Sequence, residues 1–434
     1  SLTRLTLMLN GLPALPLAAL TMPVYIFLPT FYAENLGLGL SLTGTLLLAT
    51  RLFDMVSDPV IGALSDRTGM KWGRRRPWIA AGAPRTLLGV WMLLVPPADA
   101  GAAHLLIWSL ALYLGWTMLL LPLSAWGAEL SLNYDMRSRI AAWREGFTVF
   151  GVLAALGLIA AFGGAETPET ALFLIAVFVS VLLPVTLIFL FWRVPEPETL
   201  QGPPIKFREG LRVLAGNRPF RRLILAYLLN GLANGLPATL FWLFVTHILG
   251  RADLAGPFLF LYFLCGMLGV PLWTALSTRY SKHRVWCGAM LWASLFFLLV
   301  PFIGAGDLWL FGVMTVLTGL ALGADLTLPA SMQADVVDVD TAQTGQQRTG
   351  LYFALWSMAT KAALALAAGL AFPALDMLGF APDKGAGLIW LTVFYALVPI
   401  GMKLIAIALM WGHELDRDTV RTYTETVNSR LERT

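Results

Sequence analysis

Apolar runs recur from one end of the 434-residue chain to the other, and this repetition limits the fold more than any single motif does. An α-helix rises about 1.5 Å per residue, so a run of about 20 residues crosses a bilayer core of about 30 Å. Only 13% of the residues are charged, against about 25% in an average soluble protein. The sequence therefore predicts an all-α polytopic membrane protein and argues against a soluble enzyme.

Charged residues and Gly/Pro clusters divide these apolar runs into twelve predicted membrane spans. The longest hydrophilic stretch lies between the sixth and seventh spans and splits the chain into two halves. The sequence therefore predicts a six-helix bundle at 1–193, a cytoplasmic central loop at 194–218, a second six-helix bundle at 219–412 and a cytoplasmic tail at 413–434. The twelve predicted spans cover 10–33, 42–65, 76–97, 104–130, 138–162, 171–193, 219–248, 253–277, 284–303, 307–332, 348–375 and 386–412.

Most of the 30 Lys and Arg residues fall on one side of these spans, which by the positive-inside rule places both termini in the cytoplasm. The formal charge of +4 thus matters less than the position of the basic residues, and no nucleic acid partner is expected. The protein is expected in the lipid bilayer of the cell (inner) membrane. The two cysteines, Cys265 and Cys287, lie inside apolar runs and supply neither a disulfide framework nor a thiolate metal site. No cofactor is expected, and a monomer is the expected state.

The second predicted span contains three ionisable residues, Arg51, Asp54 and Asp58, and their spacing of three and four residues places them on one helix face. Each ionisable side chain at the centre of a span costs about 2.5 to 3.5 kcal/mol, so its presence needs a reason. Lys361 lies at a similar depth in the eleventh span. A cation between the two carboxylates, Na⁺ or H⁺, would displace Lys361 from them, which would couple cation entry to helix pairing. The alternative is a static cluster of salt bridges.

The second span is followed at 62–78 by the sequence GALSDRTGMKWGRRRPW, which resembles the signature loop of the major facilitator superfamily. Together with DMVSDP at 54–59, it resembles the glycoside-pentoside-hexuronide cation symporters. Three further stretches extend this resemblance: PLSAWGAEL with NYDMRSRIAAWREGF at 122–147, ADVVDVDTAQTGQQRTGLYF at 334–353, and SMATK at 357–361.

The resemblance implies a major facilitator fold of two six-helix bundles, and symport of a sugar or glycoside with Na⁺ or H⁺ by alternating access. It also implies a role for each matching position. Asp54 and Asp58 match the carboxylates that bind the cation, with Ser57 as a neutral oxygen donor beside them. Lys361 matches a lysine near that site, and Arg144 matches an arginine that lines the inner cavity. Asp66, Arg67, Gly69 and Arg74 match the gating loop.

The sequence departs from the family at positions that recognise the substrate. Ala18 stands where the first helix of melibiose-type permeases has an acid, and Leu326 replaces a tryptophan on the tenth helix. A threonine that helps bind Na⁺ aligns with Leu119, although Thr117 is two residues away and is the candidate ligand here. Because the first span has few hydrogen-bonding side chains, the alternative cargo is a lysophospholipid or another amphiphile, as in the sodium-dependent lysophospholipid symporters of the same family.

Four side chains are candidates for contact with the substrate. Trp126 is suited to stack on a sugar face or to pack, and Asn230 and Asn234 form an i, i+4 amide pair that can meet hydroxyl groups or bridge helices. Asp325 can contact substrate, take part in proton coupling, or pair with Arg85 or Lys403. The sequence contains no Ser/His/Asp, Cys/His or phosphate-loop pattern, so we expect a transporter and not an enzyme, and a receptor or scaffold would leave the intramembrane charges without a task.

Overall fold

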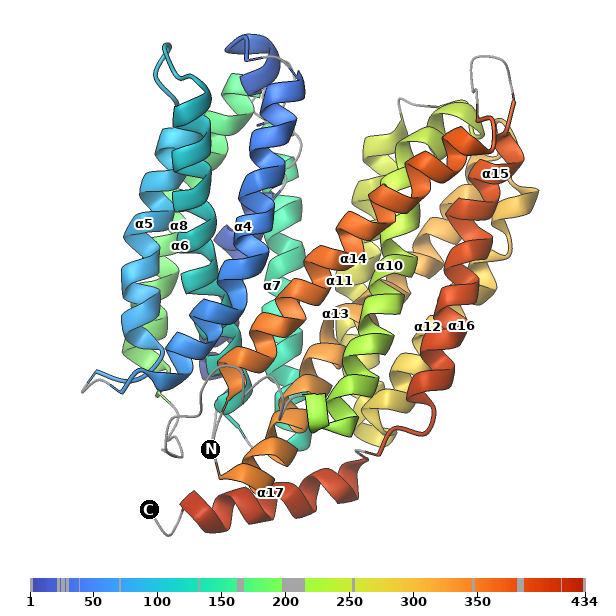
Figure 1. Ribbon diagram of the computed structural model, residues 1–434. Coiled ribbons are helices and arrows are strands. Elements are labelled where there is room, and N and C mark those ends of the chain that lie inside the picture. Colours follow the sequence, from blue (N-terminus) through green and yellow to red (C-terminus); the bar gives the residue numbers. More distant parts are fainter. Residues whose placement is uncertain are drawn as a thin grey trace. The chain divides into compact units, whose positions relative to one another are not determined.

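The computed structural model describes residues 3–21, 24, 28, 31–38, 40–69, 72–131, 133–161, 168–196, 215–251, 254–345, 348–380, 386–414 and 416–431. Long helices account for most of these residues (Figure 1). In chain order they are α1 (Arg4–Gly11), α2 (Ala14–Ala19), α4 (Leu40–Arg67), α5 (Arg76–Leu94), α6 (Ala102–Glu129), α7 (Tyr134–Ala161), α8 (Pro168–Arg193), α10 (Arg218–His247), α11 (Ala255–Arg279), α12 (Lys282–Phe297), α13 (Leu308–Thr344), α14 (Thr349–Met377), α15 (Leu388–Thr392), α16 (Val398–Met410) and α17 (Arg417–Leu431), with a π-helical turn at Val393–Leu397.

Nine of the helices in the described ranges are long and apolar enough to cross a membrane. They fall on the predicted spans from the fourth to the twelfth. The helix α4 coincides with the second predicted span and α5 with the third, while α1 and α2 lie in or just before the first. The prediction of an all-α polytopic membrane protein is confirmed.

Proline marks several helix starts and also lies inside several spans. Pro219 follows the first residue of α10, where a missing N–H costs nothing, and the Asn217 side chain accepts a 3.1 Å hydrogen bond from Phe220 N. Prolines inside spans are tolerated because neighbouring helices satisfy the freed backbone groups. These internal prolines are Pro59, Pro84, Pro122, Pro184, Pro237, Pro271 and Pro329.

The chain divides into two compact units, unit 1 (Ser1–Ile205, Asp340–Leu355 and Thr426–Thr434) and unit 2 (Lys206–Val339 and Trp356–Glu425). The change from unit 1 to unit 2 falls within the predicted central loop, of which residues 197–214 lie outside the described residues. The helices α13, α14 and α17 each contribute to both units. The predicted domain boundaries stay a prediction.

Each unit has its own apolar core. In unit 1, α5 runs alongside α6 and α8 (Figure 1). The core there includes Leu93, Leu112 and Ile175, and the buried Tyr32 hydroxyl donates a 3.1 Å hydrogen bond to the Leu93 carbonyl. In unit 2 the core is rich in aromatic rings, which stack between α10, α13 and the π-helical turn; they include Phe244, Phe311 and Tyr395.

Candidate functional site

Two buried carboxylates of α4 meet a hydroxyl of α6 inside unit 1. The Thr117 Oγ1 atom lies 3.0 Å from Asp54 Oδ1 and 3.0 Å from Asp58 Oδ1. Ser57, which lies between the two acids in the sequence, is buried. Its hydroxyl donates a 3.0 Å hydrogen bond to the Asp54 backbone carbonyl, which leaves the lone pairs of the hydroxyl oxygen as acceptors. The structure thus brings together Thr117 and the two carboxylates predicted to bind the cation, with Ser57 on the same helix as the acids.

The chemistry of this cluster suits a small hard cation or a proton. Two carboxylates that share one hydroxyl repel each other when both are ionised, and a positive charge between them removes that repulsion. All four side chains offer oxygen, the ligand that hard cations prefer. The arrangement can therefore exchange a bound proton for a metal cation with the same set of atoms.

The predicted coupling network also includes Arg51, Arg144 and Lys361. Arg51 is on α4 but its side chain is exposed. Arg144, on α7, donates from Nε (2.9 Å) and Nη2 (2.6 Å) to Oε1 of the adjacent Glu145. Lys361 is half-buried on α14 in unit 2, and its predicted approach to the α4 carboxylates stays a prediction.

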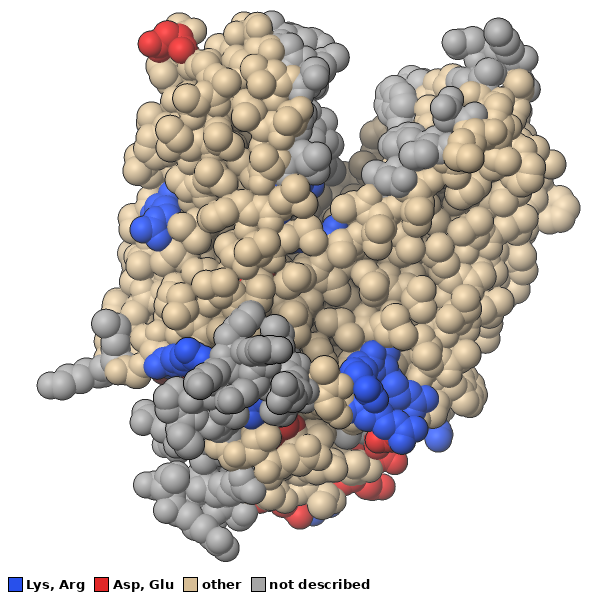
Figure 2. All heavy atoms as spheres, viewed as in Figure 1, with Lys and Arg blue, Asp and Glu red and all other residues tan. Residues whose placement is uncertain are grey.

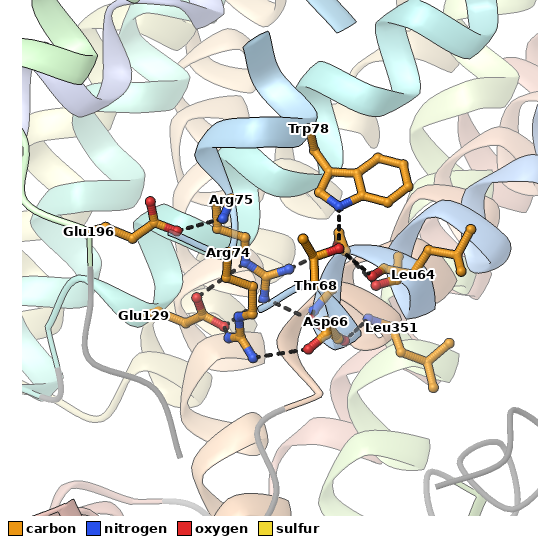
Figure 3. Close-up of polar contacts among 12 residues, drawn as sticks. Leu64, Asp66, Thr68, Arg74, Arg75, Trp78, Glu129, Glu196 and Leu351 are labelled. Atoms are coloured by element: carbon orange, nitrogen blue, oxygen red, sulfur yellow. Dashed lines mark hydrogen bonds and ion pairs between the residues drawn. The ribbon is translucent and has the colours of Figure 1, made fainter. Parts of the chain in front are cut away.

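The carboxylate of Asp66, at the end of α4, caps the first turn of α14 (Figure 3). Its Oδ1 accepts a hydrogen bond from Gly350 N at 2.8 Å, and its Oδ2 accepts one from Leu351 N at 2.9 Å. A negative charge is favourable at a helix N-terminus, where backbone N–H groups have no partner within the helix. Gly62 makes the approach possible, because a Cβ there would lie 2.5 Å from the Gly350 carbonyl oxygen.

Two arginines of the signature loop join Asp66 to the end of α6. Arg75 is fully buried, and its Nη2 donates to both Asp66 Oδ1 and Glu129 Oε1 at 2.7 Å. Arg74 forms a second ion pair with Glu129. Burial alone would lower the pKa of Arg75, but the charges of Glu129 and Asp66 outweigh it and raise that pKa. For Arg74, burial and the neighbouring Arg75 lower the pKa.

The other two predicted gating residues, Arg67 and Gly69, are exposed at the end of α4. Sequence reasoning missed Ser65, Glu129 and Glu196, which complete the network. Ser65 Oγ accepts from Arg75 Nη1 at 2.9 Å, and Glu196 Oε1 accepts from Arg75 N at 2.5 Å (Figure 3). One feature of the sequence could have indicated the ion pairs of Glu129: it is an acidic residue in the otherwise uncharged stretch PLSAWGAEL, and a basic loop follows that stretch.

Substituting Asp66 with asparagine is expected to loosen the first turn of α14. Asparagine keeps one acceptor but loses the charge that two backbone N–H groups and Arg75 share, so amide exchange at Gly350 and Leu351 should become about tenfold faster, since hydrogen bonds to a charged group contribute about 1.5 to 3 kcal/mol. Hydrogen exchange of peptides covering this turn measures the effect. Arg67→Gln, which alters the exposed neighbour, is the control, and unchanged protection in Asp66→Asn would contradict the capping role.

Trp126 is placed for packing and not for stacking on a substrate. Its side chain is 0% exposed, and Nε1 donates a 2.9 Å hydrogen bond to the Pro195 carbonyl. The ring stacks on Phe191, and the Arg76 guanidinium carbon lies 5.6 Å from its centroid. This geometry gives no support to the predicted sugar contact, because no ring surface is open to a ligand.

Trp126→Ala is therefore expected to lower the free energy of unfolding by about 3 to 5 kcal/mol and to leave substrate affinity unchanged. Thermal unfolding in detergent and the KM for uptake measure the two effects separately. Trp126→Phe keeps a ring against Phe191 but loses the hydrogen bond to Pro195. Its free energy of unfolding should therefore lie between that of the unmodified chain and that of Trp126→Ala. If Trp126→Ala instead raises the KM and leaves the melting temperature unchanged, Trp126 contacts the substrate.

The other three candidates for substrate contact bind one another in unit 2. The Asp325 carboxylate on α13 accepts hydrogen bonds from Asn230 Nδ2 (2.9 Å), Asn234 Nδ2 (2.8 Å) and Trp286 Nε1 (2.7 Å). Lys403 Nζ on α16 donates to the oxygens of both asparagines at 2.6 and 2.7 Å and lies 3.8 Å from Asp325 Oδ2.

This cluster ties four helices together and leaves little capacity for a ligand. A carboxylate offers about four acceptor positions, and at Asp325 three N–H donors and one ammonium group surround them. Of the two pairing partners expected for Asp325, Lys403 is the one that the structure provides. The geometry therefore favours helix bridging over substrate contact for Asn230, Asn234 and Asp325.

Comparison with known proteins agrees with this architecture. Residues 9–417 match the sequence model of a family described as MFS/sugar transport protein. Curated relatives include the sodium-dependent lysophosphatidylcholine symporter 1-A of Danio rerio (26% identical, covering 82% of this chain and 74% of that protein) and the putative glycoside/cation symporter YagG of Escherichia coli (26%, 77% and 75%). Another is the isoprimeverose transporter of Lactiplantibacillus pentosus (25%, 89% and 82%).

Solved structures with the same fold include a bacterial homologue of the iron transporter ferroportin in an outward-facing state, with a TM-score of 0.69 at 15% identity, covering 94% of this chain and 99% of that one. The Escherichia coli fucose:proton symporter FucP matches with a TM-score of 0.68 at 14% identity, covering 95% and 98%. The predicted major facilitator fold is confirmed, and the predicted resemblance is confirmed by the family match. The chain is an integral membrane protein that belongs to the MFS/sugar transport protein family.

Proposed function

We propose that the chain is a secondary active transporter that couples symport of a sugar or glycoside to entry of Na⁺ or H⁺, with the cation held by Asp54, Asp58, Ser57 and Thr117. The observation that carries this proposal is the Thr117 hydroxyl at 3.0 Å from each of two buried carboxylates. Buried acids that repel each other in a membrane-spanning helix are costly unless a cation compensates them.

The helix α4 provides the physical link between the cation and the signature loop. It carries Asp54 and Asp58 in its middle and Asp66 at its end, eight residues or roughly 12 Å beyond Asp58. Cation entry cancels the repulsion at Thr117 and changes how α4 packs on α6. Because one helix carries both sites, that change also shifts the Asp66 carboxylate relative to the first turn of α14, and this alternates access to the substrate.

The proposed cargo follows the glycoside/cation symporter and the isoprimeverose transporter among the relatives. A lysophospholipid is the second candidate, because a relative is a lysophosphatidylcholine symporter and because the helix α2, within the first predicted span, is apolar. Its buried side chains in α2 are Leu15, Leu17, Ala18 and their neighbours, with no hydrogen-bonding group among the described side chains of that helix. The protein is proposed to act as a monomer with both termini in the cytoplasm, since Lys and Arg concentrate on that side.

Uptake into proteoliposomes tests the function and separates the two cargoes. Labelled glycosides and a labelled lysophospholipid are offered at fixed pH with an inward Na⁺ gradient, and with choline in place of Na⁺. Accumulation of a glycoside supports the proposal, and its dependence on Na⁺ identifies the ion. Accumulation of lysolipid alone would replace the sugar with the amphiphile, and no gradient-driven accumulation of either would contradict symport.

A further inference from the structure

An ion pair of two adjacent residues, Arg144 and Glu145, lies near the middle of α7. The membrane-spanning part of this helix covers Asp135–Ile159, and Glu145 is two residues, or roughly 3 Å, from its centre. In the view of Figure 2, most charged side chains lie near the lower edge of the molecule, below a broad and largely uncharged surface. A carboxylate and a guanidinium at mid-depth are costly there, so their presence points to a function.

The exposed residues of α7 lie along one side of the helix. Among the described residues of α7, they are Arg139, Trp143, Phe150, Gly157 and Ala161. Each residue of an α-helix is turned about 100° from the one before it, so Glu145 lies about 200° around the helix from Trp143. The carboxylate of Glu145 is thus attached almost opposite this exposed side.

The pair does not join two helices, unlike Asp325 and Lys403, which lie on α13 and α16. Arg144 and Glu145 are neighbours in α7, and neighbouring residues of a helix do not face each other, so only their long side chains meet. Their contact therefore adds nothing to the packing of α7 on α1 and α2. A role as a bridge between helices does not explain why the pair is present.

Each member of the pair keeps polar atoms that are open to a ligand. The two hydrogen bonds run from Nε and Nη2 of Arg144 to Oε1 of Glu145. Within the described ranges, Glu145 Oε2 accepts no hydrogen bond and Arg144 Nη1 donates none. Both side chains stay partly accessible, at 20% for Arg144 and 15% for Glu145. At mid-depth, accessible ionised groups meet water or a polar ligand and not lipid.

The backbone of α7 is fixed where the pair is attached. A Cβ at Gly11 of α1 would lie only 2.8 Å from the Arg144 backbone nitrogen, so the two helices are in close contact at this point. The Thr148 hydroxyl donates a 3.1 Å hydrogen bond to the Arg144 carbonyl one turn away. Groups on a rigid element hold a ligand more precisely than groups on a loop.

We propose that Glu145 and Arg144 bind two neighbouring hydroxyl groups of the transported sugar, an inference that rests on the proposed function and makes Glu145 a specificity-determining residue. One hydroxyl donates to Glu145 Oε2, and the oxygen of the next accepts from Arg144 Nη1. A hydroxyl has both a donor and acceptors, so a pair of them matches these two atoms without breaking the ion pair. A phosphate would instead place a negative charge beside the Glu145 carboxylate.

Equilibrium binding of labelled glycosides to the purified full chain in detergent tests this proposal without an ion gradient. The panel contains a glycoside and its deoxy analogues, each of which lacks one hydroxyl. Glu145→Gln should raise the Kd of the parent glycoside about tenfold, because the hydroxyl loses a charged acceptor. For the analogue that lacks this hydroxyl, Glu145→Gln should leave the Kd nearly unchanged. Glu145→Asp, which keeps the charge, should restore part of the affinity.

Asp135→Asn is the matched control, since Asp135 is an acid in the first turn of the same helix. It should bind the parent glycoside as the unmodified chain does. The proposal is overturned if Glu145→Gln leaves the Kd of the parent unchanged, if it weakens every analogue by the same factor, or if the unmodified chain binds no glycoside. A glycoside that binds through Glu145 but is not accumulated in proteoliposomes would support this proposal and contradict symport, so the two fail separately.

Discussion

Asp58→Asn and Asp54→Asn are each expected to abolish gradient-driven accumulation of substrate while preserving some exchange down a gradient. Asparagine keeps the shape of the side chain and its contact with Thr117 but removes one of the two charges that hold the cation. Cation affinity should fall by about tenfold to a hundredfold, as expected for the loss of one charged partner. Uptake into proteoliposomes at a series of Na⁺ concentrations and pH values measures both effects.

Asp99→Asn is the control for this prediction, because Asp99 is an exposed acid of the same unit in the connection between α5 and α6. It should accumulate substrate as the unmodified chain does. If both Asp54→Asn and Asp58→Asn still concentrate the substrate fully, the carboxylates are a structural cluster and the cation site lies elsewhere. A pH dependence that disappears only in one variant would assign the proton to that carboxylate.

Lys403→Met is expected to lower the free energy of unfolding by about 3 to 5 kcal/mol, because it leaves the Asp325 carboxylate buried without its cation. Asp325→Leu should cost a similar amount, since it leaves a fully buried ammonium group with only two amide oxygens. The apparent melting temperature in detergent measures both effects. The double variant removes both charges, and apolar residues of similar volume in place of a buried pair are often neutral, so much of the loss should be recovered.

This pattern distinguishes helix bridging from substrate recognition. If Asp325→Leu melts as the unmodified chain does but changes which glycosides are transported, Asp325 contacts the substrate after all. Lys282→Met offers a comparison within the same unit, because Lys282 and Asp335 form a second fully buried pair at 2.7 Å. The melting temperature of Lys282→Met should also fall. If a double variant that removes both charges of this pair recovers much of the loss, then breaking a buried ion pair in unit 2 is costly mainly because it leaves one charge uncompensated.

Most of the fold could be predicted because the bilayer sets the length and composition of each span. The acids Asp54 and Asp58 could be placed on one face for the same kind of reason, since their spacing matches the helical repeat. Thr117 was harder to place. Counting along the chain aligned Leu119 with the hydroxyl position of the family, and only the packing of α6 on α4 shows that the residue two places earlier meets both carboxylates.

Partners across helices were the part that the sequence did not determine. Asp325 had two candidate cations, Arg85 and Lys403, and hydropathy does not say which one shares its side of the bundle. The direction of Trp126 was open for the same reason, since a tryptophan in an apolar span packs or lines a cavity according to a helix rotation that composition does not reveal. Glu129 was missed because its two arginine partners lie more than fifty residues earlier in the chain.

The position of Thr117 has a consequence for ion choice. Its hydroxyl carries a single hydrogen, so at any moment it donates to Asp54 or to Asp58 and leaves the other carboxylate to be neutralised by a proton. Under the proposed function, rotation about the Cβ–Oγ1 bond would turn the hydrogen away and present a lone pair to a metal ion between the acids. The same atoms would then serve either ion, and a torsion of one side chain would select between them.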